Sequence, residues 1–226
     1  KRPPVLGKEV PDESATVEQV RYLEPQAASW PKAEIVVGNP PFIGASAMRR
    51  ALGDGYVDAL RATHANVPDS ADLVMFWWEH AAQLLASGAI QRFGFITTNS
   101  ITQTFNRRVL EQRLGENLHL AFAIPDHPWV DNTDGAAVRV AMTVAEAGMG
   151  SGRLLTVTSE TSNPKDGTVD VNLVEKTGHI HADLTVGANV AGAIALQSNG
   201  GISSPGFKLH GAGFIVTSEE VASLDP

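Results

Sequence analysis

A largely apolar run, residues 33–38, ends abruptly in Asn39-Pro40-Pro41-Phe42, and this junction constrains the fold more than any other stretch. β-Branched residues followed by glycine and two prolines are typical of a buried strand that stops in a rigid turn. Pro41 fixes its own φ and pushes Pro40 into extended geometry, so the Asn39 side chain is held at the strand's carboxyl end. In open α/β sheets that edge binds ligands. A strand followed by a merely structural Pro-rich turn is the alternative.

Composition limits the remaining possibilities. The 226 residues are enough for one large domain, or for one domain plus part of another, and 43% of them are hydrophobic. No apolar stretch approaches the ~20 residues of a membrane-spanning helix, and the first residues lack the apolar core of a secretory signal. Cysteine is absent, which excludes disulfides and thiolate metal sites. We therefore expect a cytoplasmic protein without membrane contact.

Charge gives a second limit. The formal net charge of −8 argues against a chain that binds polyanions over its whole surface, but it leaves room for a local basic face. Positive charge gathers at Arg49-Arg50 with Arg61, and at residues 107–108 with Arg113, although solvated helix faces are the commoner explanation of such groups. The seven histidines lack metal-ligand spacing, so we expect no metal site.

Hydrophobic periodicity predicts alternating strands and helices. We expect strands over 33–38, 92–97, 118–124 and 137–144, a glycine-interrupted helical flap over 48–62, and helices over 71–86 and 103–114, the first of these capped by Ser70. This alternation is typical of a parallel, doubly wound α/β sheet. The segment 125–135 has no helical pattern, so we expect a loop there and antiparallel pairing of the last two strands.

The amino-acid composition of the sequence changes after residue 148. Gly, Ser, Thr and Asn become frequent, and short strands are expected over 153–158 and 169–174. We therefore predict three parts: a loop or linker over 1–32, the carboxyl-terminal part of a catalytic domain over 33–148, and a β-rich extension over 149–226.

The residues at the first strand end suit one difficult reaction. Methylating the exocyclic amine of a base is slow because the nitrogen lone pair is delocalised into the ring. The Asn39 side-chain oxygen and the Pro40 carbonyl are two fixed acceptors that can draw this nitrogen toward tetrahedral geometry. Phe42 offers a flat face for a base taken out of its stack. This chemistry needs no metal and no strong base.

Gly38-Asn39-Pro40-Pro41-Phe42 resembles the catalytic motif of amino-group methyltransferases that use S-adenosylmethionine. Asp72-Leu73, the run 93–100, and Asp126-His127-Pro128-Trp129 before 136–140 resemble, in order, later motifs of adenine-specific DNA methyltransferases. The resemblance is nearest to the large single-chain bacterial restriction-modification enzymes, which fuse methylase and target recognition. It covers most of 33–145, and the tail 201–214 resembles the segment that leads into target recognition. It implies a Rossmann-like class I methyltransferase sheet, DNA as partner and S-adenosylmethionine as cofactor.

The resemblance also implies roles for individual residues. Asn39 and Pro40 would accept from the target amine, with Pro41 completing the motif, and Phe42 would stack on the flipped base. Trp129 is either the other wall of the base pocket or a core residue, and Asn99 either lines the site or makes a turn.

The cofactor would have two contacts in this chain. Trp77 stands where the family places an aromatic near the cofactor's adenine, although a core position is the alternative. Asn39 would reach the cofactor from the catalytic turn.

One part of the family pattern is missing. The Gly-x-Gly turn that holds the cofactor precedes the catalytic motif in this class, and residues 1–32 contain none. We therefore expect a fragment that lacks its amino-terminal half, has an incomplete cofactor site and is inactive alone. Two alternatives stay open: a methyltransferase acting on guanine N2 of ribosomal RNA or on protein glutamine, and a non-catalytic nucleic-acid-binding module.

Overall fold

The computed structural model describes residues 20–129, 138–162 and 169–193. The chain divides into two compact units, Lys1–Asn189 and Val190–Pro226, and all elements named below belong to the first. The tail 201–214, expected to lead into target recognition, lies outside the described residues. In chain order the elements are β1 (Ile35–Gly38), α1 (Ala45–Leu52), α2 (Asp54–Thr63), α3 (Val74–Ala86), β2 (Arg92–Thr98), the 3₁₀ helix η1 (Asn99–Thr102), α4 (Thr104–Leu114), β3 (Leu118–Trp129), β4 (Val138–Ala147), β5 (Gly152–Ser162) and β6 (Val169–Gly178).

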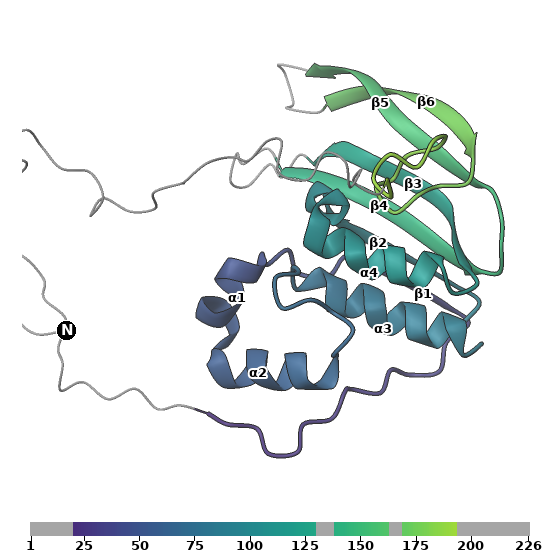
Figure 1. Ribbon diagram of the computed structural model, residues 1–226. Coiled ribbons are helices and arrows are strands. Elements are labelled where there is room, and N and C mark those ends of the chain that lie inside the picture. The colour runs from purple at the N-terminus through teal and green to yellow at the C-terminus, as the bar shows by residue number, and fades with distance from the viewer. Residues whose placement is uncertain (1–19, 130–137, 163–168, 194–226) are drawn as a thin grey trace, which may run out of the picture. The chain divides into compact units, whose positions relative to one another are not determined.

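The strands form one open six-stranded sheet in the order β1-β2-β4-β3-β5-β6 (Figure 1). β1 pairs parallel to β2, and β4 lies antiparallel between β2 and β3. Since β4 opposes both neighbours, β1, β2 and β3 all run in the same direction. This mixed sheet with helical crossovers confirms the predicted α/β class, and the expected antiparallel pairing of the third and fourth strands is correct. The prediction of a buried first strand is wrong: β1 lies at the edge of the sheet, and its Ile35 and Val37 side chains are exposed.

Two helices cover one face of the sheet. α3 packs against β2 and β4, and α4 lies beside it over β3 (Figure 1). Alternation in β2 directs Phe93, Phe95 and Thr97 into this interface, where all three are buried. Trp78 of α3 meets Phe93 edge to face, with ring centroids 5.2 Å apart. Such aromatic pairs contribute roughly 0.5–1.5 kcal/mol beyond the area they bury.

The predicted start of α3 is wrong. Ser70 does not cap the helix, which begins at Val74 with Leu73 in the cap position. The reason is tertiary: the backbone N–H of Asp72 donates to Asn106 and that of Leu73 donates to Ile43, so neither needs a local cap. The end of the helix agrees with the sequence, because Ser87 is the C-cap and Gly88 adopts a φ of 75°.

The segment 125–135 is only partly a loop. β3 continues through Pro125 and Pro128 to Trp129, and residues 130–135 lie outside the described part of the chain. Prolines interrupt regular ladders, but the register shifts between Ile124 and His127, which is an irregularity of the kind that accommodates them.

The β-rich part after residue 148 joins the same sheet. β5 pairs parallel to β3 and antiparallel to β6, and both strands are longer than the sequence suggested. Residue 148 is therefore not a break in the sheet. Residues 20–32, part of the predicted linker, contain no helix or strand.

Candidate active site

The Asn-Pro-Pro-Phe turn begins directly at the carboxyl end of β1. Gly38 pairs with Phe95 of β2, and a Cβ at Gly38 would lie 3.2 Å from the Phe95 ring, so glycine allows this close packing. Beyond it Asn39 is exposed and Phe42 is half-buried. The turn thus anchors its backbone against the sheet while its polar side chain faces solvent.

Three strand ends meet at this edge of the sheet. Because β1, β2 and β3 run in the same direction, Asn39, Asn99 and Trp129 all stand at the carboxyl edge. The Asn99 Nδ2 donates to Asp126 Oδ1 at 3.2 Å, which links the ends of β2 and β3 directly. The structure therefore brings the expected substrate-binding residues to one edge.

Arg139 of β4 bonds to the neighbouring strands β3 and β5 near the carboxyl end of β3. Its Nε donates to Asp126 Oδ1 at 2.6 Å, and its Nη2 donates to Glu160 of β5 at 2.8 Å. The two carboxylates, Glu160 first and Asp126 second, raise the pKa of the Arg139 guanidinium. Arg139 therefore joins three strands beside Trp129, a role that the sequence did not indicate.

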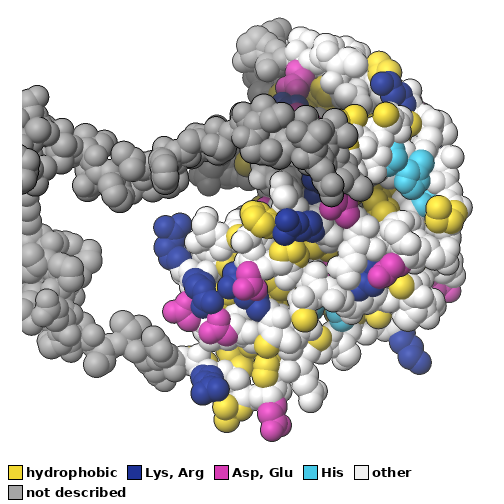
Figure 2. All heavy atoms as spheres, in the orientation of Figure 1, with side chains coloured by type: hydrophobic (Ala, Val, Ile, Leu, Met, Phe, Trp, Pro, Cys, Tyr) yellow, Lys and Arg dark blue, Asp and Glu magenta, His cyan; other side chains and the backbone are white. Residues whose placement is uncertain are grey.

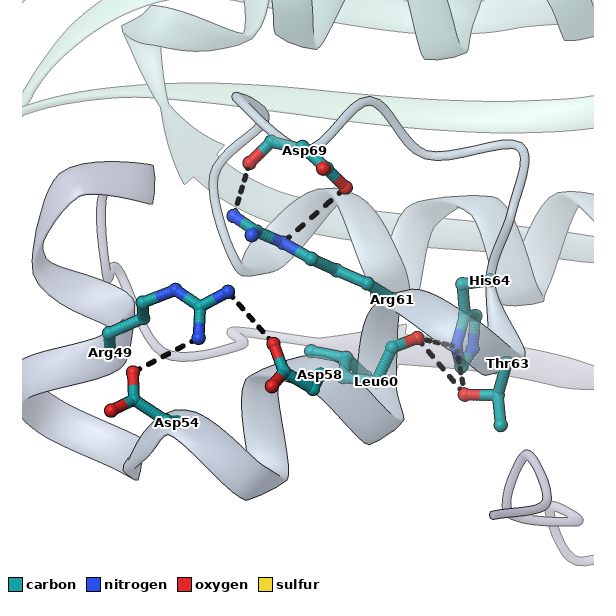
Figure 3. Close-up of polar contacts among 8 residues, drawn as sticks. All are labelled: Arg49, Asp54, Asp58, Leu60, Arg61, Thr63, His64 and Asp69. Carbon is teal, nitrogen blue, oxygen red and sulfur yellow. Dashed lines mark hydrogen bonds and ion pairs between the residues drawn. The ribbon is translucent and has the colours of Figure 1, made fainter. Parts of the chain in front are cut away.

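Most of the clustered arginines are neutralised. Arg49 on α1 donates to Asp54 at 3.0 Å and to Asp58 at 2.8 Å, which pins α1 to α2, and Arg61 contacts Asp69 (Figure 3). On the face shown in Figure 2, acidic and basic side chains are interspersed over this region instead of forming a patch of one sign. The arginines of the first predicted basic cluster therefore mainly hold α1, α2 and the segment after α2 together.

The second cluster is likewise occupied. Arg107 pairs with Glu111, and Arg113 pairs with Glu79 and Glu116. Among the described residues no ion pair engages Arg50 or Arg108, and the Arg108 guanidinium instead lies 5.4 Å from the centre of the Phe105 ring. Within the two predicted clusters, Arg50 and Arg108 are thus the cations without a carboxylate partner among the described residues.

Trp77 lines an apolar cavity of about 350 Å³. Its walls come from the segment before β1, from α2 and from α3, and they include Trp30 and His80, whose rings are 4.5 Å apart. Burial, with the nearby His64 as a second cause, lowers the pKa of His80. Within the described part of the chain, the buried His80 Nε2 has no hydrogen-bond partner. Trp77 is therefore both packed against the core and open to a cavity.

A second cavity, of about 620 Å³, adjoins the β2 and β3 ends. Asn99 and Asp126 line it together with Lys176 of β6 and Asp183. Asn99 thus lines this cavity and also bonds to Asp126 of β3. These positions agree with both expected roles, lining the site and stabilising the turn after β2.

Sequence reasoning gave no role to Asp72, Ser100 and Asn106, which form a hydrogen-bonded cluster behind the Asn-Pro-Pro-Phe turn. Asn106 is 4% exposed, although its amide is polar. A buried amide on an amphipathic helix is a signal that helix periodicity alone could have revealed.

Two kinds of feature are absent from the described residues, a metal-binding cluster and a membrane-spanning helix. In the part of the chain that the structure describes, no group of three or more His, Cys, Asp or Glu side chains is arranged to hold a metal ion. Within the same residues, no helix is long and apolar enough to cross a membrane.

Comparisons with known proteins place this geometry in a family. The family model of the MmeI DNA-methyltransferase domain matches residues 9–156, well over half of the chain. No curated protein matches. Among solved structures, the type IIL restriction-modification enzyme MmeI in complex with DNA is similar with a TM-score of 0.54 and 23% identity, over 69% of this chain and 20% of that one. The chain thus spans about a fifth of the length of that relative.

Two other structures are more distant. The M protein of the type I restriction enzyme EcoKI gives a TM-score of 0.42 with 14% identity, over 62% of this chain and 28% of that one. The type IIG restriction endonuclease BpuSI gives 0.39 with 11% identity, over 63% and 19%. The structural similarity to MmeI shows the fold alone, whereas membership rests on the family model. The chain belongs to the family of the MmeI DNA-methyltransferase domain.

Proposed function

We propose that this chain supplies the amine-binding and base-binding edge of a DNA methyltransferase that transfers a methyl group from S-adenosylmethionine to the exocyclic amine of adenine. One observation carries the proposal. Asn39-Pro40-Pro41-Phe42 stands at the carboxyl end of β1 with the Asn39 amide exposed and Phe42 half-buried beside it. A polar acceptor next to a partly covered aromatic face is what recognition of a base amine requires.

The two acceptors act on the nucleophile. The Asn39 side-chain oxygen and the Pro40 carbonyl accept hydrogen bonds from the two N–H groups of the amine, which localises the nitrogen lone pair. As the nitrogen gains positive charge during transfer, the same oxygens stabilise it. Since both acceptors are fixed before the reaction, no reorganisation is needed at the transition state.

Phe42 and Trp129 are proposed as the walls of the base pocket. β1 and β3 are three strand positions apart in the sheet, so their ends are separated by ~14 Å at the backbone. Two aromatic side chains that converge from these ends leave room for one stacked base. Asn99 is the first residue of η1, directly after β2, and is proposed to contact the edge of the base.

The cavity beside Trp77 suits the adenine of the cofactor. It is lined by aromatic rings, among them Trp30 and Trp77, so it offers stacking surfaces. Trp77 is one helical turn into α3, whose amino-terminal Leu73 donates to Ile43 just after the catalytic turn. When bound, S-adenosylmethionine would supply the electrophilic methyl group for the amine held at Asn39. We propose Trp77 and Asn39 as its contacts in this chain, with the remaining contacts supplied from elsewhere and the isolated chain inactive.

DNA is the proposed partner. The net charge of −8 disfavours broad phosphate contact, so binding would depend on a few local cations. Arg50 and Arg108 are the candidates, since the other clustered arginines are paired with carboxylates.

The decisive experiment is single-turnover methylation of an adenine-containing duplex by an active enzyme that contains this chain. Asn39→Ala should slow transfer by at least ~10²–10³-fold, the usual cost of one lost electrostatic contact. Asn172→Ala, which removes an exposed amide on β6, is the matched control. Near-normal transfer by Asn39→Ala would identify the turn as purely structural.

A further inference from the structure

The carboxylate of Asp72 lies at the centre of a hydrogen-bonded cluster and uses both of its oxygens. Oδ1 accepts from the backbone N–H of Ala45 at 3.1 Å. Oδ2 accepts from the Ser100 hydroxyl at 2.7 Å and from the Asn106 side-chain amide at 2.8 Å. The three donors come from three different elements, α1, η1 and α4. A charged side chain that accepts from three elements fixes their relative positions.

One half of this cluster holds the segment behind the catalytic turn. The cap residue of α1 is Gly44, which has no side chain, so the first helical N–H group depends on Asp72, 27 residues away. The negative charge also lies at the helix amino terminus, where it is favoured. Next to it, the Leu73 N–H donates to Ile43 O at 2.9 Å. These two contacts clamp residues 43–45, which directly follow Phe42.

The other half holds the end of β2. Ser100 lies just past β2 and accepts from the Thr98 hydroxyl while it donates to Asp72. Asn106 is almost fully buried, and its amide donates to Ser100 O at 2.9 Å while its Oδ1 accepts from the Asp72 N–H at 2.8 Å. Every polar group in this half is engaged, so its geometry is strongly determined.

We infer that Asp72 is a positioning residue for methyl transfer: it locks the loop after β1 to the loop after β2, and so holds Asn39 and Phe42 in register with the neighbouring strand end. This inference rests on the proposed function. Asp72 acts on the reaction through the backbone of residues 43–45. A displacement of about 1 Å at a reacting group can cost ~10²-fold in rate, so loosening the loop should slow the chemical step.

The test separates positioning from simple helix stabilisation. In an active enzyme that contains this chain, Asp72→Ala should lower the single-turnover rate at saturating DNA and cofactor by ~10²-fold and change the DNA dissociation constant by less than ~3-fold. Asp72→Asn keeps an oxygen for the Ala45 amide and loses the Asn106 contact, so its rate should lie between Asp72→Ala and wild type. Asp69→Ala, which removes an exposed carboxylate three residues away, is the control and should retain the wild-type rate.

A double variant provides the sharpest discrimination. Gly44 has φ −66° and ψ 152°, which serine adopts readily, so Gly44→Ser can cap α1 locally. In the Asp72→Ala background it should restore amide-exchange protection along α1 without restoring the rate. Full recovery of the rate would show that Asp72 only caps the helix and would overturn the inference.

Amide exchange in the chain itself gives a readout independent of activity. Asp72→Ala should speed exchange at Ala45 and at the amides of the 43–47 segment, whereas Asp69→Ala should not. Unchanged exchange would refute the positioning role whether or not the wild-type enzyme methylates DNA. Exchange could be faster in Asp72→Ala while the wild-type enzyme does not methylate adenine. That result would refute the proposed function, but the contacts of Asp72 and Leu73 to residues 43–45 would still be supported.

Discussion

Glu79 of α3 and Arg113 of α4 form an ion pair in the interface between the two helices, with Arg113 Nε donating to Glu79 Oε2 at 2.9 Å. Glu79 is fully buried, and the Arg113 side chain is 11% exposed. Hydrogen bonding to Glu79 is the main cause that raises the pKa of Arg113. The pair joins the helices that cover the sheet.

Removing one partner should therefore be costly. Arg113→Leu would leave the Glu79 carboxylate buried without its cation, and we expect a loss of about 3–5 kcal/mol in the free energy of unfolding. The double variant Glu79→Leu/Arg113→Leu should be more stable than either single variant. Arg107→Leu breaks an exposed pair with Glu111 on the same helix and should cost no more than about 0.5 kcal/mol. Urea denaturation measures all four, and equal losses for Arg107→Leu and Arg113→Leu would contradict the argument.

Phe42 gives a prediction about the flipped base. Phe42→Ala should weaken retention of the extrahelical base by ~1–3 kcal/mol, while binding of the surrounding duplex changes less, because stacking is local to one nucleotide. Phe42→Trp preserves a flat face and should be tolerated better. Fluorescence of 2-aminopurine at the target position, measured in an active enzyme that contains this chain, reports the difference. Equal signals from the Ala and Trp variants would argue that Phe42 does not stack on the base.

The lowered pKa of His80 predicts a pH dependence of stability. Burial disfavours the charged ring in the folded state, so the unfolded chain binds the proton more readily below the ordinary pKa of 6.5. Stability should therefore fall as pH falls through 6.5, and His80 should contribute nothing to the pH dependence well above it. His80→Gln should make the curve of unfolding free energy against pH flatter below 6.5. Parallel curves for the two proteins would show that the ring is not desolvated.

Gly152 is a position where added volume should be damaging. A Cβ there would lie 2.0 Å from the Leu120 carbonyl oxygen, and this neighbour is backbone that cannot rotate away. Gly152→Ala should therefore destabilise the junction of β3 and β5 by several kcal/mol or prevent folding. Gly115→Ala is the matched control, since its nearest neighbours would be at 3.7 Å and its φ of −79° suits alanine. Thermal unfolding should separate the two variants clearly.

The elements that the sequence predicted well are those in which local pattern and tertiary environment agree. β2 alternates because one of its faces packs on α3, and α3 is apolar because it packs on the sheet and beside α4. The position of the Asn-Pro-Pro-Phe turn at the end of β1 could also be predicted, since the prolines and the preceding glycine set its backbone locally.

The remaining features depend on contacts between residues distant in sequence. The start of α3 is set by donors that bond to Ile43 and Asn106, neither of which a helix-capping rule considers. The extension of β3 through Pro125 depends on a register shift against β4. The Asp72 cluster links residues 27 to 34 positions apart, so a local pattern can single out the buried Asn106 but not its partners.

The position of β4 has a consequence for how the chain can fold during synthesis. β2 and β3 do not pair with each other, and the strand that joins them is made after both. Until residues 138–147 have left the ribosome, each of these strands has an open edge, which favours association with other chains. A nascent chain stalled before residue 138 should therefore be sensitive to protease and prone to aggregate. A chain stalled far enough beyond residue 147 that β4 has left the exit tunnel should be able to pair β4 with both β2 and β3.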